Sequence, residues 1–248
     1  MTTDESDFSS LESVLAQAVD RARVTGRVGL REGAECGTLE LTLLGSSRLP
    51  FSLNTGEATA WLVATGVDAT AGYDEDNNLV IALRGKTGVD QLVQRLLAPF
   101  MYAESVRERL GNALAQHRLH VAVEVEDERS LALEVRDSDG LEAAVQLSAV
   151  LGADSIGAGL KLHKPGGMRK LADRMRLLLT GALGAGVRVL AEPGCAHAED
   201  ELLIHLTVEQ GLRLAGRIAA EPARAEQEED LSPVEEAWIP PIWISSDP

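Results

Sequence analysis

Three stretches of the chain share one pattern: residues 79–89 (LVIALRGKTGV), 131–141 (LALEVRDSDGL) and 202–212 (LLIHLTVEQGL). In each, three apolar residues alternate with their neighbours, and a glycine followed by an apolar residue comes nine positions after the first of them. Such alternation is typical of a strand with one buried face, and the glycine would lie where a following helix approaches the sheet. Any ββα unit with a short connection gives a similar spacing. We favour a true internal ββα repeat, because an alternating segment also precedes each copy.

Residues 9–99, which surround the first copy, predict the element order α-βββ-α-ββ-α. Ser9 and Glu12 form a capping box, and apolar residues from Leu11 to Ala22 follow at helical spacing. The remaining elements are three strands, a helix capped by Thr55, a hairpin and a last helix, expected at 28–30, 39–43, 49–53, 55–65, 74–83 and 87–98. The last helix is expected to stop at Pro99, because proline breaks the hydrogen-bond ladder of a helix.

Residues 103–222 predict a variant of the same order. The expected elements are a helix at 103–117, a hairpin at 121–135, a helix capped by Ser138 or Asp139, a short strand at 156–162, a long regular helix at 168–183, a hairpin at 187–206 and a helix at 212–218. The chain is therefore expected to be an α+β protein with antiparallel sheets and packed helices in two related halves, 9–100 and 103–222. A disordered stretch is expected at 1–8, and an acidic linker with a Trp- and Pro-rich tail at 223–248.

The charge of the chain limits its partners. Its 248 residues include 23 Lys and Arg against 39 Asp and Glu, a formal net charge of −16. Net repulsion makes broad binding to nucleic acid or to an anionic membrane unlikely. Neither a membrane span nor a secretory signal is expected, and two cysteines provide no disulfide framework, so a cytoplasmic location is predicted. Four lysines among abundant alanine and glycine indicate a bacterial source with a GC-rich genome.

One segment is basic in this acidic chain. Residues 161–176 hold His163 and six Lys and Arg residues, and Pro165-Gly166-Gly167 lies just before the long helix. Free N–H groups and the positive end of the helix dipole would suit a phosphate or carboxylate there. The candidate anion- or partner-binding residues are Lys161, Lys164, Gly166, Gly167, Arg169, Lys170 and Arg174. The alternative is a solvated helix face that pairs with acidic residues elsewhere, the run at 226–236 among them.

The C-terminal residues carry a second candidate site. An acidic run that ends at Glu236 leads into Trp238-Ile-Pro-Pro-Ile242-Trp243, and the prolines favour an extended chain. Exposed tryptophans would make this segment prone to aggregate, so Trp238, Ile242 and Trp243 are predicted to bind to another surface. They would dock either on the chain itself or a second copy, which we favour, or on another protein.

The sequence contains no recognised catalytic motif, which lowers the expectation of an enzyme without excluding one. The spacing of Cys195, His197 and His205 matches no zinc template, and His205 is expected on the polar face of a strand. We therefore nominate no catalytic residue, no metal site and no cofactor.

The element order predicted for residues 9–99 is similar to that of type III secretion chaperones and of YbjN-type bacterial regulators. The elements that carry this resemblance are the capped helix at Leu11, strands at Val28, Leu39 and Leu49, the helix at Thr55, the hairpin to Leu83 and the helix ending at Pro99. The likeness is one of order alone, so no functional residue is transferred. It implies a small acidic non-catalytic domain that binds extended segments of other proteins, often as a dimer.

Three function hypotheses follow from these observations, the third being an enzyme without a recognised motif. The first is a protein-binding chaperone-like or regulatory adaptor protein, with a homodimer as one option. The alternative is a protein that binds a small anionic ligand or a nucleotide through residues 161–176.

Overall fold

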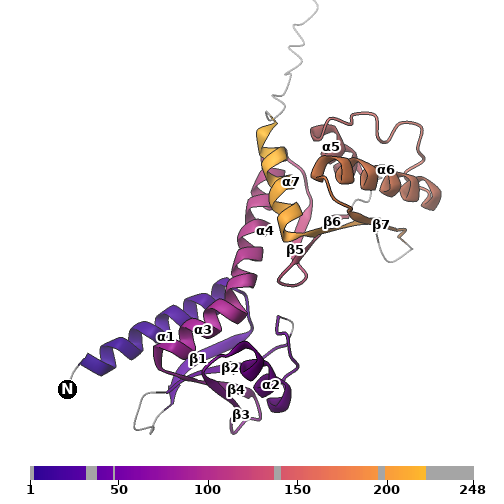
Figure 1. Ribbon diagram of the computed structural model, residues 1–248. Coiled ribbons are helices and arrows are strands. Elements are labelled where there is room, and N and C mark those ends of the chain that lie inside the picture. The colour runs from indigo at the N-terminus through magenta and orange to yellow at the C-terminus, as the bar shows by residue number, and fades with distance from the viewer. Residues whose placement is uncertain (1–2, 32–37, 47, 137–140, 195–198, 222–248) are drawn as a thin grey trace, which may run out of the picture.

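The predicted α+β class is confirmed by a computed structural model, which describes residues 3–31, 38–46, 48–136, 141–194 and 199–221 (Figure 1). Two antiparallel four-stranded sheets, one in each half, are covered by helices. The strand orders are β1-β2-β4-β3 and β5-β6-β8-β7.

The first half buries one face of its sheet under helices. Its elements are α1 (Thr3–Arg21), β1 (Gly26–Arg31), β2 (Thr38–Leu43), α2 (Thr55–Thr65), β3 (Ala69–Tyr73), β4 (Leu79–Arg84) and α3 (Gly85–Leu92). Val28, Leu41, Ile81 and Ala71 stand opposite one another across the four strands and pack into the core. The alternation in the sequence therefore identified the buried face correctly.

The second half follows the same plan with an additional helix. Its elements are α4 (Ala98–Gln116), β5 (Ala122–Val125), β6 (Ser130–Arg136), α5 (Glu142–Val150), α6 (Pro165–Leu183), β7 (Arg188–Glu192), β8 (Glu201–Thr207) and α7 (Val208–Ala220). Val123, Leu133, Ile204 and Val189 form the matching apolar row. Met168, Leu171 and Met175 of α6 cover it, as the regular spacing of that helix predicts.

The repeated pattern corresponds to two equivalent half-domains rather than to three equal units. β4 and β8 occupy the same place in their sheets, and each runs directly into a helix that carries the glycine, Gly88 or Gly211. The third stretch forms β6, which occupies the place of β2 in the other sheet. Its Gly140, and the predicted caps Ser138 and Asp139, lie outside the described residues.

The helix does not stop at Pro99, so that prediction is wrong. α3, a π-helical turn (Val93–Leu97) and α4 follow one another without a gap, and Figure 1 shows the resulting helix passing from the first half into the second. In the π turn the N–H of Ala98 donates to the carbonyl of Val93, five residues back. A proline ring clashes with the carbonyl four residues before it, and the wider turn makes room for that ring.

The prediction of a third strand at 49–53 is also wrong. Side chains of this segment pack in the core and bind the first turn of α2 instead. Phe51 is buried and its ring packs on Trp61 of α2, with centroids 5.5 Å apart. The backbone N–H and hydroxyl of Ser52 donate to the Glu57 carboxylate, at 3.0 and 2.6 Å. A strand would have to give up these contacts. α2 has its predicted bounds, but its cap is Asn54 rather than Thr55.

Two further predictions differ from the structure. α1 begins at Thr3, so Ser9 is not its cap and residues 3–8, expected to be disordered, are helical. The short strand expected at 156–162 is a series of turns, in which N–H groups such as those of Ala158 and Leu160 donate three residues back. Gly159 adopts a positive φ there, a conformation that does not continue a strand.

The two equivalent glycines lie where their helices touch neighbouring elements. A Cβ at Gly88 would overlap the carbonyl oxygen of Asp68, and one at Gly211 would lie 2.6 Å from Cδ1 of the buried Leu131. The close approach that the sequence predicts is therefore confirmed at both positions.

We expect Gly88→Ala and Gly211→Ala each to lower the free energy of unfolding, by about 1–3 kcal/mol, because an added methyl overpacks these contacts. Gly88→Ala should cost more, since backbone moves less easily than a leucine methyl. Gly216→Ala, in α7 with nothing within 4 Å of the added carbon, is the matched control and should be neutral or stabilising. Urea denaturation measures all three, and equal values for Gly88→Ala and Gly216→Ala would contradict the prediction.

Candidate interaction surfaces

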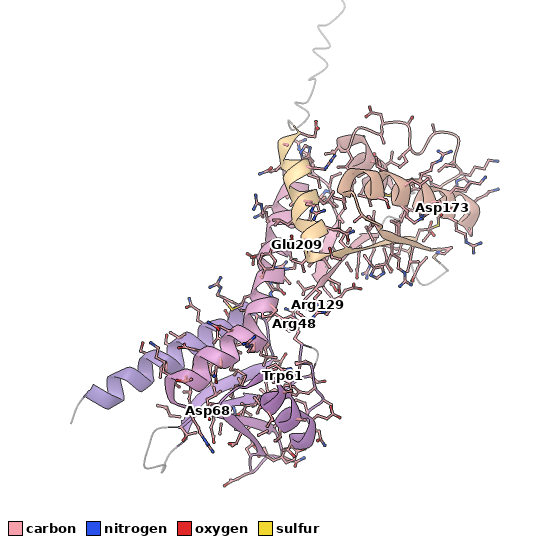
Figure 2. The ribbon with its side chains drawn as sticks, viewed as in Figure 1. Arg48, Trp61, Asp68, Arg129, Asp173 and Glu209 are labelled. Carbon is pink, nitrogen blue, oxygen red and sulfur yellow. The ribbon has the colours of Figure 1, made fainter. Side chains whose placement is uncertain are left out.

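A buried carboxylate connects three segments where α4 leaves the first half. The side chain of Glu104 is 5% exposed and accepts from Arg48 and Arg107, each at 2.6 Å. Arg23, just after α1, lies at 3.4 Å. Arg48 also donates to the carbonyl of Ala22, at 2.9 Å, and lies over the Phe100 ring. Figure 2 shows Arg48 near the place where the long helix leaves the first half. Sequence periodicity gave no sign of this cluster, because its members are far apart in the chain.

Burial alone would raise the pKa of Glu104, but the hydrogen bonds and charges of Arg107 and Arg48 outweigh it and hold the pKa below its ordinary value. The carboxylate therefore stays ionised at neutral pH. A group whose pKa is lowered by folding stabilises the native state above its unfolded pKa, near 4.3 for glutamate, and loses this contribution as the pH falls below it. Through these contacts the carboxylate holds the segment after α1, the loop after β2 and α4 together.

We expect Glu104→Gln to lower the free energy of unfolding by about 2–4 kcal/mol at pH 7, because it leaves Arg48 with an uncompensated charge that is 17% exposed. The difference from the unmodified chain should shrink as the pH falls through about 4. Arg23→Ala is the control and should cost less than about 0.5 kcal/mol, since Arg23 is 57% exposed. Denaturation curves over a pH series measure both, and a difference that does not change with pH would contradict the assignment.

The face of the first sheet that points away from the core carries small and polar side chains. One row across it is Arg27, Thr42, Val80 and Gly72, and the next contains Glu40, Ala82 and Thr70. A shallow hollow of about 460 Å³ lies over β2, β4 and β3 on this face. Its lining includes the small side chains of both rows and three acidic residues, Glu40, Asp74 and Glu75.

The matching face of the second sheet carries several ion pairs. Arg136 contacts Glu134 at 2.8 Å and Glu201 at 3.1 Å. His205 lies on this face, as predicted, with its Nδ1 3.0 Å from Glu126. This sheet therefore offers a more polar surface than the first.

The basic segment 161–176 spans the turns before α6 and the first three turns of that helix. Lys161, Lys164, Gly166, Arg169, Lys170 and Arg174 are exposed, whereas Gly167 is buried. The N–H of Gly167 donates to the carbonyl of Lys164 at 2.8 Å, and a Cβ at Gly167 would overlap the carbonyl oxygen of Lys161. Gly167 is therefore needed for a close approach of backbone, and its N–H already has a partner.

Arg174 also has partners within the fold. Its Nη1 donates to the carbonyls of Ile156 and Ala158, at 2.6 and 3.2 Å. This guanidinium ties the turns that precede α6 to the helix itself. The contacts of Arg174 with the two carbonyls are seen in the structure, and a contribution of Arg174 to anion binding stays a prediction.

We expect Arg174→Ala to speed amide hydrogen exchange in residues 153–160 and to cost about 1 kcal/mol, because two backbone carbonyls lose a charged donor. Arg169→Ala, one turn earlier on α6, is the control and should leave that exchange unchanged. Exchange followed by mass spectrometry distinguishes the two variants; equal protection of 153–160 in both would count against the role given to Arg174.

A groove of about 580 Å³ lies between the end of α4 and α5. It is lined by apolar Leu119, Val145 and Val150 together with polar groups that include His117. The Nε2 of His117 lies 3.0 Å from the carbonyl oxygen of Ile218 in α7, so this ring atom is already in contact with the fold.

The remaining sequence candidates are outside the described residues. These are Trp238, Ile242 and Trp243 of the tail, together with Cys195 and His197. Within the described ranges no three His, Cys, Asp or Glu side chains are grouped so that they could hold a metal ion. None of the helices described there is both long enough and apolar enough to cross a membrane.

Comparison with models of known protein families, with curated proteins and with solved structures finds no match to this chain. The resemblance in element order therefore stays an expectation, and the functional argument depends on the surfaces described above.

Proposed function

We propose that the chain is a non-catalytic binding protein, chaperone-like or a regulatory adaptor, that takes up an extended segment of another protein along β3. The observation that carries this proposal is the nature of that edge strand. β3 is the last strand of its sheet, and its sequence, ATAGY, has neither a charged residue nor a proline. Proteins usually protect an exposed edge with charges or proline, because unpaired backbone groups attract further strands.

The geometry beside β3 supports the same proposal. A segment that pairs with a sheet edge gains affinity from backbone hydrogen bonds and specificity from pockets for its alternate side chains. Thr70 and Gly72, on the outer face of β3, border the shallow hollow and leave room beside the strand. The acidic lining of Glu40, Asp74 and Glu75 favours Lys or Arg in the bound segment.

The test is site-specific photo-crosslinking in bacterial cells, with a photoreactive phenylalanine at Thr70 or at Val63. Val63 is 77% exposed on α2 and provides the control position. We expect a segment rich in Lys or Arg from another protein to crosslink at Thr70 and not at Val63. Crosslinks at Thr70 to a second copy of this chain alone would replace the proposal by homodimerisation, and equal capture at both positions would overturn it.

A peptide with the recovered sequence then gives a quantitative test. Thr70→Lys places a charge on the edge and should weaken peptide binding about tenfold or more, whereas Val63→Lys should not change it. Fluorescence anisotropy measures both, and unchanged affinity in Thr70→Lys would exclude β3 as the site.

The second candidate function, binding of a small anionic ligand, is favoured by one observation. Lys161, Lys164, Arg169, Lys170 and Arg176 are exposed, and within the described ranges none of them makes an ion pair. We name these five residues the α6 basic surface. If this candidate is right, a phosphorylated metabolite should stabilise the chain thermally and should fail to stabilise Arg169→Glu/Lys170→Glu.

A further inference from the structure

Within the described ranges, the residues of the α6 basic surface make no ion pair. Asp173 is the single acidic residue between 161 and 176, and Figure 2 shows nitrogen-tipped side chains around it along α6. Lys170 and Arg176 lie on the exposed side of the helix, because the residues between them that face inward, Leu171, Ala172 and Met175, belong to the core. In a chain of net charge −16, this group of exposed cations would attract an anionic segment.

The chain itself carries an acidic segment of suitable composition. Residues 226–236 (EQEEDLSPVEE) contain six Asp and Glu and no Lys or Arg. They lie in the stretch that follows α7 and is outside the described residues. The charges of the two segments are thus complementary.

The end of α7 lies close enough to α6 for this segment to reach it. Arg213 donates to the carbonyl of Leu183, the last residue of α6, at 3.2 Å. At about 1.5 Å per helical residue, and with the Arg213 side chain included, the end of α7 and Lys170 lie within roughly 40 Å of each other along this path. The chain between Glu221 and residues 226–236 can span about 17–50 Å when extended. Linking the two segments in one chain also raises their effective concentration to about the millimolar range.

We propose that the acidic segment 226–236 docks on the α6 basic surface of its own chain, so that this surface is occupied until a stronger anionic partner displaces the segment. The contact joins carboxylates to exposed Lys and Arg, so it is weakened by salt and is reversible. It does not depend on the binding site proposed at β3.

Nuclear magnetic resonance of the full chain tests the proposal, with the backbone amide signals of 226–236 as the readout. We expect these signals to differ from those of a free peptide of residues 222–248 and to move to the peptide positions in Arg169→Glu/Lys170→Glu. The same movement should occur at about 1 M sodium chloride, where the Debye length falls to about 3 Å.

The matched control is Lys86→Glu/Arg95→Glu, which makes the same change of charge on exposed residues of α3 and the π turn. It should leave the tail signals in place. Tail signals that coincide with those of the free peptide in the unmodified chain would overturn the proposal. Equal movement in both double variants would show a general charge effect and would overturn it as well.

Inorganic phosphate distinguishes an occupied surface from an open anion site. If the segment is docked, Glu226→Gln/Glu228→Gln/Glu229→Gln/Asp230→Asn should bind phosphate more tightly than the unmodified chain, as followed by the amide signals of residues 166–176. Equal phosphate affinity in the two chains would show that the acidic segment does not compete and would overturn the proposal.

Discussion

One continuous helix, from Gly85 to Gln116, contributes to the cores of both halves and thereby holds the fold together. One side of its first part is buried in the first core, through Val89, Leu92, Leu96, Leu97 and Phe100. Leu110, Ala113 and Leu114 are buried in the second. Between them Ala103 and Val106 pack with Leu131 and Val208 in a small cluster of their own. Because a helix of 32 residues is about 48 Å long and stiff, it fixes where the second core can form relative to the first.

The Glu104 cluster lies at the point where this helix leaves the first core. An ionised carboxylate that is 5% exposed needs charged partners, and here they come from the end of α1 and from the loop after β2 as well as from α4. The cluster therefore specifies how α1, that loop and the long helix meet. The loop that includes residues 48–52 is held by three side chains. Arg48 contacts Glu104, the Phe51 ring packs on Trp61, and the Ser52 hydroxyl donates to Glu57.

The two surfaces proposed for binding have opposite charge and belong to different halves. The hollow beside β3 is acidic, and the surface of α6 is basic. A basic peptide and an acidic segment would thus occupy separate sites without direct competition. The net charge of −16 still argues against broad binding to nucleic acid, but it conceals a local distribution that allows both contacts.

Sequence alone determined what depends on local periodicity. The alternating apolar residues of β2, β4, β6 and β8 fixed the buried face of each sheet, and the spacing in α6 fixed the face that covers the second core, because these patterns follow from strand and helix geometry. It also located the basic segment and the close approaches at Gly88 and Gly211. The sequence ATAGY shows that β3 has no charged residue, but only the strand order shows that β3 is an edge strand.

Tertiary structure decided the features that depend on contacts between distant residues. The helix continues through Pro99 because packing on both cores favours it and a π turn relieves the clash of the proline ring. Residues 49–53 leave the sheet, and Phe51 is buried in the core with its ring packed on Trp61. Arg174, predicted to bind an anion, holds backbone carbonyls, and no spacing in the sequence could indicate which carbonyls the fold would bring to it.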